Sequence, residues 1–310
     1  MKKANLAISV ITLSVLACGS LEPAPVPPTL GPDALATIVA ETMQAIPPAT
    51  SVPATATMEV QPTVASDTPT VTTAPPSEIL VSVPGKSFKI PPGVGTGATL
   101  ESVPGVLDSA LPIWAIYPAH DEFKLEGYAL QNKFFIPKII LYPKAEFSTV
   151  NEGAAEIITD LQNILADQSA PLPEVLPFLP LFNAGQIFHS NDQILSFQNG
   201  TGVRFLTQFS QAPTPVNNHE LFYTFQGLTN DGAYYVAAIL PVNATYLAAD
   251  AEPETPIPAD GITFDWNNFE TLPGYLAAVK QKLNATDPNA FTPTLSSLDQ
   301  MIQSLSVTGN

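Results

Sequence analysis

Side chains suited to metal or acid–base chemistry are scarce in this chain. Its three histidines, His120, His189 and His219, lie in three separate segments. A zinc protease helix needs two histidines four residues apart, and the position four residues after His219 is Tyr223. We therefore expect no metal site and no cofactor, and we expect His189 to be a packed or surface residue of a strand.

Motifs for nucleotide binding and covalent catalysis are incomplete. VPGKS at 83–87 resembles the end of a phosphate-binding loop, but Leu80 stands where that loop needs a glycine. The chain contains no G-x-S-x-G and no S-x-x-K motif. A serine–histidine pair assembled from distant residues is left open. The sequence therefore gives no catalytic residues.

Three residues are candidates for ligand binding: Arg204, Tyr223 and Tyr235. Arg204 is the only arginine and lies on a strand-like stretch, so it could bind a ligand carboxylate; the alternative is an internal ion pair. Adjacent side chains of a strand point to opposite faces, so the pairs at 222–223 and 234–235 put one ring on each side. The outer rings would form a stacking platform for sugars or a docking surface, unless both faces are covered.

Two acidic segments are candidate cation sites. PAHDEF places His120 beside Asp121 and Glu122, which suits a loop site for a cation or a solvated turn. The second segment is a proline-marked loop with four acidic residues, Asp250, Glu252, Glu254 and Asp260. Their spacing differs from that of an EF-hand, so we expect a solvated loop.

Cys18 is the only cysteine. It follows a short basic start and an apolar run at 4–17, a pattern typical of a secretory signal and too short for a membrane span. VLAC at 15–18 resembles the lipobox of bacterial lipoproteins, although Leu16 is bulkier than the usual occupant of its position. The alternative is an ordinary signal peptide with an incidental cysteine.

The lipobox resemblance implies that residues 1–17 are a signal peptide and that acyl chains are attached at Cys18. The chain would then be lipid-anchored in the cell envelope, on the extracytoplasmic side of a bacterial membrane. Gly19, where an aspartate would favour inner-membrane retention, favours surface exposure. A net charge of −17 argues against nucleic acid as a partner and against binding of anionic lipid by the domain. The expected partner, besides the membrane, is an envelope or extracellular protein or glycan.

Residues 18–77 are predicted to form a disordered stalk. They are rich in Pro, Thr, Ala and Val, and residues 20–77 contain no Lys, Arg or aromatic residue. Such a composition buries too little apolar surface to offset the entropy of ordering. The segment at 32–46 has apolar residues on one helical face, which indicates a short helix within the stalk.

Residues 78–310 are predicted to form one α+β domain. Strand-like stretches surround the turn signals Asn199–Gly200 and Asn230–Gly232, which predicts an antiparallel β-meander. About three helices are expected to back one face of this sheet, at 151–168, at 272–284, and a last helix that starts at Thr292 with Pro293 as its first helical residue. Further strands are expected before residue 150, including PKIILYPKAEF.

The order of strands, helix, meander and terminal helix resembles the PsbP-like fold of photosynthetic extrinsic proteins. The closing LSSLDQMIQSLSV is similar in style to the last helix of that family. The resemblance implies a binding or assembly protein. Three functions are therefore weighed: a binding or interaction module, an extracytoplasmic hydrolase acting on envelope or polymer, and a structural or assembly lipoprotein.

Overall fold

The computed structural model describes residues 77–309, which form a single α+β domain, as predicted. The predicted signal peptide, Cys18, the segment at 32–46 and all but the last residue of the stalk lie outside the described residues. The described residues lie within one compact unit, Val71–Asn310. No helix in the described part of the chain is long and apolar enough to cross a membrane.

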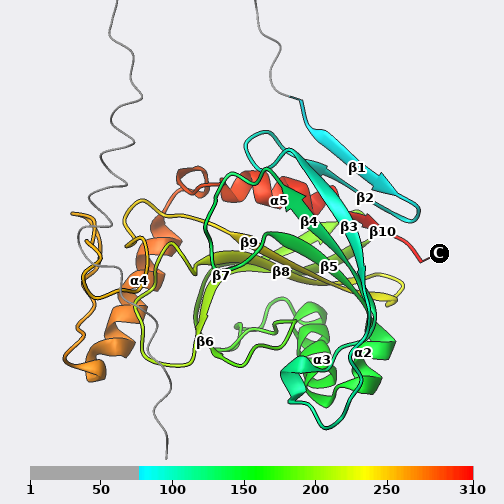
Figure 1. The fold of residues 1–310 in the computed structure, drawn as a ribbon, viewed down its shortest axis with the longest axis horizontal. Helices are drawn as coiled ribbons and strands as arrows, with labels where there is room; N and C mark the ends of the chain where they lie inside the picture. The colour runs from blue at the N-terminus through cyan, green and yellow to red at the C-terminus, as the bar shows by residue number, and fades with distance from the viewer. Residues whose placement is uncertain (1–76, 310) are drawn as a thin grey trace, which may run out of the picture. The chain divides into compact units, whose positions relative to one another are not determined.

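The domain is built on two antiparallel sheets (Figure 1). The large sheet has seven strands in the order β3-β4-β5-β9-β8-β7-β6, and the small sheet has the order β1-β2-β10. The strands are β1 Ile79–Val83, β2 Lys86–Ile90, β3 Gly97–Val103, β4 His120–Glu126, β5 Lys138–Pro143, β6 Gly185–Phe197, β7 Gly200–Ser210, β8 Phe222–Thr229, β9 Tyr234–Pro241 and β10 Ser306–Val307. The helices are α2 Lys144–Val150, α3 Glu152–Ala166, α4 Leu272–Ala285 and α5 Leu295–Gln303, with single 3-10 turns at Ile113–Ala115, Phe269–Thr271 and Pro288–Ala290.

Strands β6 to β9 form the predicted meander. β6 pairs with β7 across the Asn199–Gly200 turn, and β8 pairs with β9 across Asn230–Gly232. In the second turn Gly232 has a φ of 69°, a conformation that favours glycine. The Asp231 carboxylate accepts hydrogen bonds from Thr229 Oγ1 and from the backbone N–H of Ala233. Both turn predictions are confirmed.

Both faces of the large sheet are covered, which confirms the alternative of a sheet covered on both sides. Helices lie on both faces rather than on one. Helices α2 and α3 pack on one face. They are joined there by Leu176, Phe178 and Leu179 of residues 171–180, which we call the proline-rich segment. Helices α4 and α5 and the small sheet pack against the other face (Figure 1). Strands β8 and β9 are buried at successive rather than alternate positions, as a sheet covered on both sides requires.

The ends of three helices differ from the predictions. Strand β5 stops at Pro143, and the KAEF that was expected to continue it starts helix α2, which buries Phe147. The helix predicted at 151–168 is α3, which starts at Glu152 because the side chain of Asn151 caps it by accepting from the N–H of Ala154. Helix α5 starts at Leu295 rather than at Pro293, because the hydroxyl of Thr294 caps the N–H of Ser297.

Candidate functional site

Arg204 forms an internal ion pair, the alternative to a ligand site. It is 5% exposed, and its Nε and Nη2 donate to the two carboxylate oxygens of Asp299 at 2.9 and 2.7 Å. The remaining nitrogen, Nη1, donates to the backbone oxygen of Asn191, and Nη2 also donates to Gln193 Oε1. The guanidinium is therefore fully engaged within the protein, between β6, β7 and α5.

Tyr223 and Tyr235 are fully buried on opposite faces of the sheet. The Tyr223 hydroxyl donates to Asp299 at 3.0 Å, and the Tyr235 hydroxyl donates to Gln226 Oε1 at 2.6 Å. Burial raises the pKa of both hydroxyls well above the usual value. The structure thus brings Arg204 and Tyr223 together around Asp299, places Tyr235 elsewhere, and leaves none of the three open to a ligand.

His120, Asp121 and Glu122 of PAHDEF lie on strand β4 rather than in a loop. Asp121 accepts from the Ser102 hydroxyl at 2.7 Å and lies 3.1 Å from the Lys86 ammonium. The Glu122 carboxylate lies 2.7 Å from Lys138 Nζ and 3.5 Å from the His120 ring. Lysines of the chain itself therefore occupy the predicted cation site. Within residues 77–309, no group of three or more His, Cys, Asp or Glu side chains could hold a metal ion.

The acidity of Glu122 gives a test of this cluster. Burial would raise the pKa of its carboxyl, but interactions with His120 and Lys138 outweigh burial and lower the pKa to about 2. The resulting stability is complete above the ordinary pKa and is lost as the pH falls through 2. We expect Glu122→Gln to lower the free energy of unfolding by about 3 kcal/mol at pH 7, and by progressively less below pH 4.

Urea unfolding at pH 7 and pH 3 measures this effect. The matched control is Glu101→Gln, because Glu101 pairs with Lys124 on the exposed side of β3 and β4. An exposed pair contributes only about 0–1 kcal/mol at either pH. The prediction would be wrong if Glu122→Gln and the wild-type domain lost the same free energy of unfolding between pH 7 and pH 3. The Glu122 ion pair would then not contribute the pH-dependent stability.

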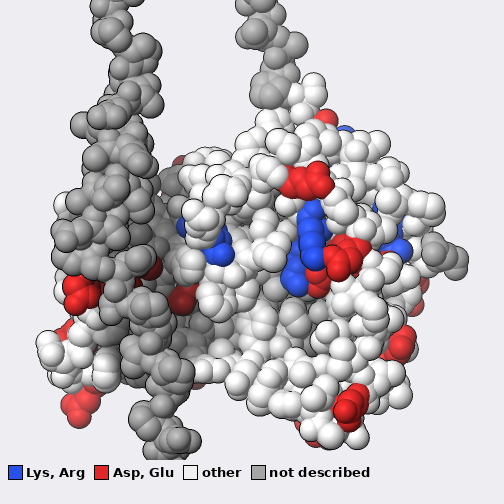
Figure 2. Space-filling view, in the orientation of Figure 1, with Lys and Arg blue, Asp and Glu red and all other residues white. Residues whose placement is uncertain are grey.

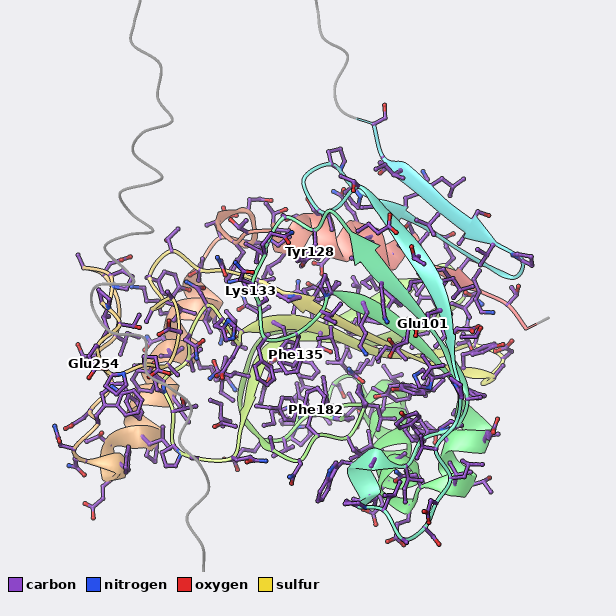
Figure 3. The ribbon with its side chains drawn as sticks, viewed as in Figure 1. Glu101, Tyr128, Lys133, Phe135, Phe182 and Glu254 are labelled. Atoms are coloured by element: carbon purple, nitrogen blue, oxygen red, sulfur yellow. The ribbon has the colours of Figure 1, made fainter. Side chains whose placement is uncertain are left out.

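The acidic loop is solvated, as expected. Glu252, Glu254 and Asp260 are exposed, and Glu254 lies at the outer edge of the loop (Figure 3). Asp250 accepts from Thr255 Oγ1 and from the N–H of Glu252, and these hydrogen bonds lower the pKa of Asp250. Asp260 pairs with Lys282 of α4. The four carboxylates therefore shape the loop and do not converge on one point.

An open groove of about 860 Å³ lies between the segment after this loop and the start of α4. Three aromatic side chains line it, Phe264, Trp266 and Tyr275. Trp266 is half-buried, whereas Phe264 and Tyr275 are buried. Trp266 is therefore the ring of this wall that offers the most surface to a ligand in the groove.

Polar and small residues complete this groove, which we call the Trp266 groove. Asp265 and Glu270 supply exposed carboxylates, and Asn267 supplies an amide. Gly274 and Ala278 lie four residues apart on α4 and so form one small-residue face of the groove. A Cβ at Gly274 would meet no atom within 4 Å, so the space above this face is open.

The aromatic wall is held in place by its neighbours. The Phe264 ring contacts Trp266 and Tyr275 edge-to-face, with centroids 4.9 and 5.1 Å apart. The N–H of Val216 donates to the Tyr275 hydroxyl at 3.0 Å, which ties α4 to the segment before β8. Burial raises the pKa of Tyr275 to about 12 and outweighs the opposing effect of this hydrogen bond. The wall is thus pre-organised before any ligand arrives.

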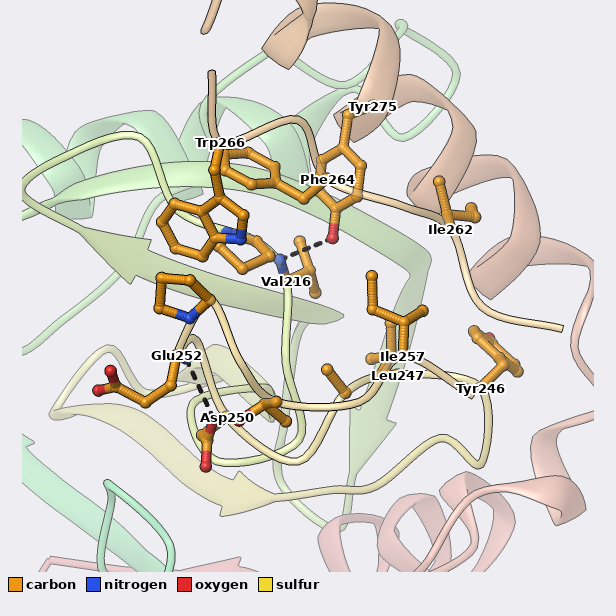
Figure 4. Close-up of a pocket in the computed structure, with 14 residues that line it drawn as sticks. Val216, Tyr246, Leu247, Asp250, Glu252, Ile257, Ile262, Phe264, Trp266 and Tyr275 are labelled. Carbon is orange, nitrogen blue, oxygen red and sulfur yellow. Dashed lines mark hydrogen bonds between the residues drawn. The ribbon is translucent and has the colours of Figure 1, made fainter. Parts of the chain in front are cut away.

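A small cavity of about 30 Å³ shares these three rings (Figure 4). Leu247 and Ile257 face the rings from the other side of the cavity. This volume has room for about two water molecules. The aromatic wall therefore separates an open groove from a nearly filled interior.

A second hollow, of about 640 Å³, lies between β6, α4 and the proline-rich segment. Buried His189 faces it and lies on β6, so its predicted place on a strand is confirmed. Its Nδ1 lies 2.8 Å from both Asp192 oxygens, and its Nε2 lies 3.3 Å from Lys280 Nζ. Among residues 77–309 no serine or threonine hydroxyl is hydrogen-bonded to a histidine ring, and the hydroxyl of Ser190 lies on the opposite side of the strand. This arrangement lacks the nucleophile that a serine hydrolase needs.

The Trp266 groove was not predicted from the sequence, although the signals were present. ITFDW at 262–266 directly follows the acidic loop, and the helix at 272–284 was predicted from its apolar residues alone. The available signals were an aromatic–acidic alternation before a helix, and small residues on the helix face away from the core. Comparison with family models, curated proteins and solved structures finds no match for this chain.

Proposed function

We propose that this chain is a membrane-anchored extracytoplasmic lipoprotein that acts as a binding module and holds its ligand in the Trp266 groove. The observation that carries the proposal is the contrast between the groove and the rest of the domain. Arg204, Tyr223 and Tyr235 are engaged in the interior, whereas Trp266 lines an open groove with two exposed carboxylates. A concave apolar surface with a few polar groups is typical of a ligand site.

The anchor and stalk of the proposal rest on the sequence. Cys18 would carry the lipid, and residues 18–77 would hold the domain away from the membrane. The proposal of a PsbP-like binding or assembly protein rests on the order of elements predicted from the sequence. The hydrolase alternative has a polar pocket at His189 but no hydrogen-bonded nucleophile among the described residues.

A thermal-unfolding screen of residues 71–310 tests the proposal, because Val71–Asn310 is a compact unit on its own. The panel contains glycans, peptidoglycan fragments, amino acids and organic cations. A ligand at 100 times its dissociation constant adds about 2.7 kcal/mol to the free energy of unfolding. We expect a stabilising ligand whose effect is lost in Trp266→Ala and retained in the control Trp114→Ala, which changes the other, exposed tryptophan. A ligand that still stabilises Trp266→Ala would place binding outside the groove.

A further inference from the structure

The chemistry of the ligand follows from the charges around the Trp266 groove. No lysine or arginine occurs between Arg204 and Lys280, a stretch that contains Asp250, Glu252, Glu254, Asp260, Asp265 and Glu270. Of the residues that line the groove, Asp265 and Glu270 are charged and none is basic. In Figure 2 the basic side chains on the visible face gather over the middle of the domain, next to acidic ones. The groove is therefore a negative site in a strongly acidic protein.

The two lysines of α4 do not neutralise the groove. Lys282 pairs with Asp260, and Lys280 contacts His189 in the other hollow. Lys282 Nζ also lies 4.3 Å above the centroid of the Tyr246 ring. The same region thus already holds an ammonium between an aromatic face and a carboxylate, with Tyr246 lining the small cavity behind the groove.

Aromatic rings beside carboxylates favour one class of small ligand. The faces of tryptophan and tyrosine attract cations, and aromatic sites of this kind recognise quaternary ammonium groups. A neutral sugar would also stack on Trp266 and donate hydroxyl hydrogen bonds to the two carboxylates. It would gain nothing from the net negative charge of the groove, which favours a cation over a neutral ligand. An anion would be repelled by Asp265 and Glu270, which lie on the rim.

We propose, building on the proposed function, that the Trp266 groove binds a small organic cation with an alkylated ammonium head. The head lies against Trp266 and between the carboxylates of Asp265 and Glu270, and the alkyl body lies on the Gly274–Ala278 face. A zwitterion that carries its own carboxylate binds more weakly, because its negative end meets the rim.

The test compares choline with its uncharged carbon analogue, 3,3-dimethylbutan-1-ol. The chain has two tryptophans, so Trp114→Phe in residues 71–310 leaves Trp266 as the only indole fluorophore. We expect saturable quenching or enhancement of its fluorescence by choline, at least about ten-fold weaker binding of the alcohol, and weaker binding of glycine betaine. The preference should fall in Asp265→Asn with Glu270→Gln, where the amide oxygen introduced at position 265 can still accept the turn hydrogen bond from the N–H of Asn267.

The outcomes separate the two proposals. Equal binding of choline and the alcohol would overturn cation recognition and leave the groove as a binding site. Cation recognition would also be overturned if choline does not bind while a glycan or peptidoglycan fragment from the screen stabilises the wild-type domain but not Trp266→Ala. The groove would again remain a binding site. If no compound of the screen acts through Trp266, both the cation proposal and the proposed function fail.

Discussion

Arg204→Met is expected to destabilise the domain by about 3–5 kcal/mol, measured by urea unfolding of residues 71–310 at pH 7. The substitution keeps an unbranched apolar side chain but removes both hydrogen bonds to Asp299. The Asp299 carboxylate, 15% exposed, is then left with the Tyr223 hydroxyl as its remaining partner. A buried carboxylate without its cation carries most of this cost.

Two variants separate the buried charge from the loss of packing. The double variant Arg204→Met with Asp299→Leu removes both charges and is expected to recover part of the lost stability. Recovery is incomplete because the hydroxyl of Tyr223 then lacks its acceptor. Lys124→Met, which breaks an exposed pair with Glu101, is expected to leave the stability close to that of the wild type. A single Arg204→Met variant as stable as the Lys124→Met control would contradict the proposed role of the buried pair.

Cys18→Ala is expected to abolish lipid attachment completely. A thioether to a diacylglyceryl group requires a cysteine sulfur, and Cys18 is the only one in the chain. The measurement is incorporation of labelled fatty acid into the full chain in a bacterial host, followed by the intact mass of the purified protein. The wild-type chain should begin at Cys18 and carry the mass of the acyl groups.

The control for this experiment is Ser20→Ala, which leaves the residues at 15–18 unchanged and should incorporate label like the wild type. Label that persists in Cys18→Ala would show attachment elsewhere and contradict the lipobox interpretation. An unmodified Cys18 in the wild-type chain would support the alternative of an ordinary signal peptide. Several acyl chains anchor a protein stably, so an acylated Cys18 would decide where the domain is displayed.

Local signals predicted much of the fold. Asn199–Gly200 and Asn230–Gly232 mark tight turns by chemistry that depends on neighbouring residues alone. The apolar stripe of 272–284 correctly gave α4, and the density of prolines excluded regular structure at 171–180. Helix α2 was not predicted because KAEF follows a strand without a turn signal. Whether KAEF forms a helix depends on how Phe147 packs against the sheet.

The site could be predicted only in part, because it depends on contacts between distant segments. Arg204 was correctly singled out as unusual, but the identity of its partner, Asp299, follows from the docking of α5 on β7. The burial of Tyr223 and Tyr235 required both sheet faces to be covered, which no single strand reveals. The Trp266 groove is formed only when the loop packs against α4 and Val216 binds Tyr275.

The position of a bound ligand tests the central claim most directly. We would record amide and indole NMR spectra of ¹⁵N-labelled residues 71–310 during a titration with the ligand that stabilises the domain most in the screen. The proposed function predicts concerted shifts at the Trp266 indole N–H and at Asp265, Glu270, Gly274 and Ala278. Shifts confined to the His189 and Lys280 region, or spread over the domain without these residues, would contradict it.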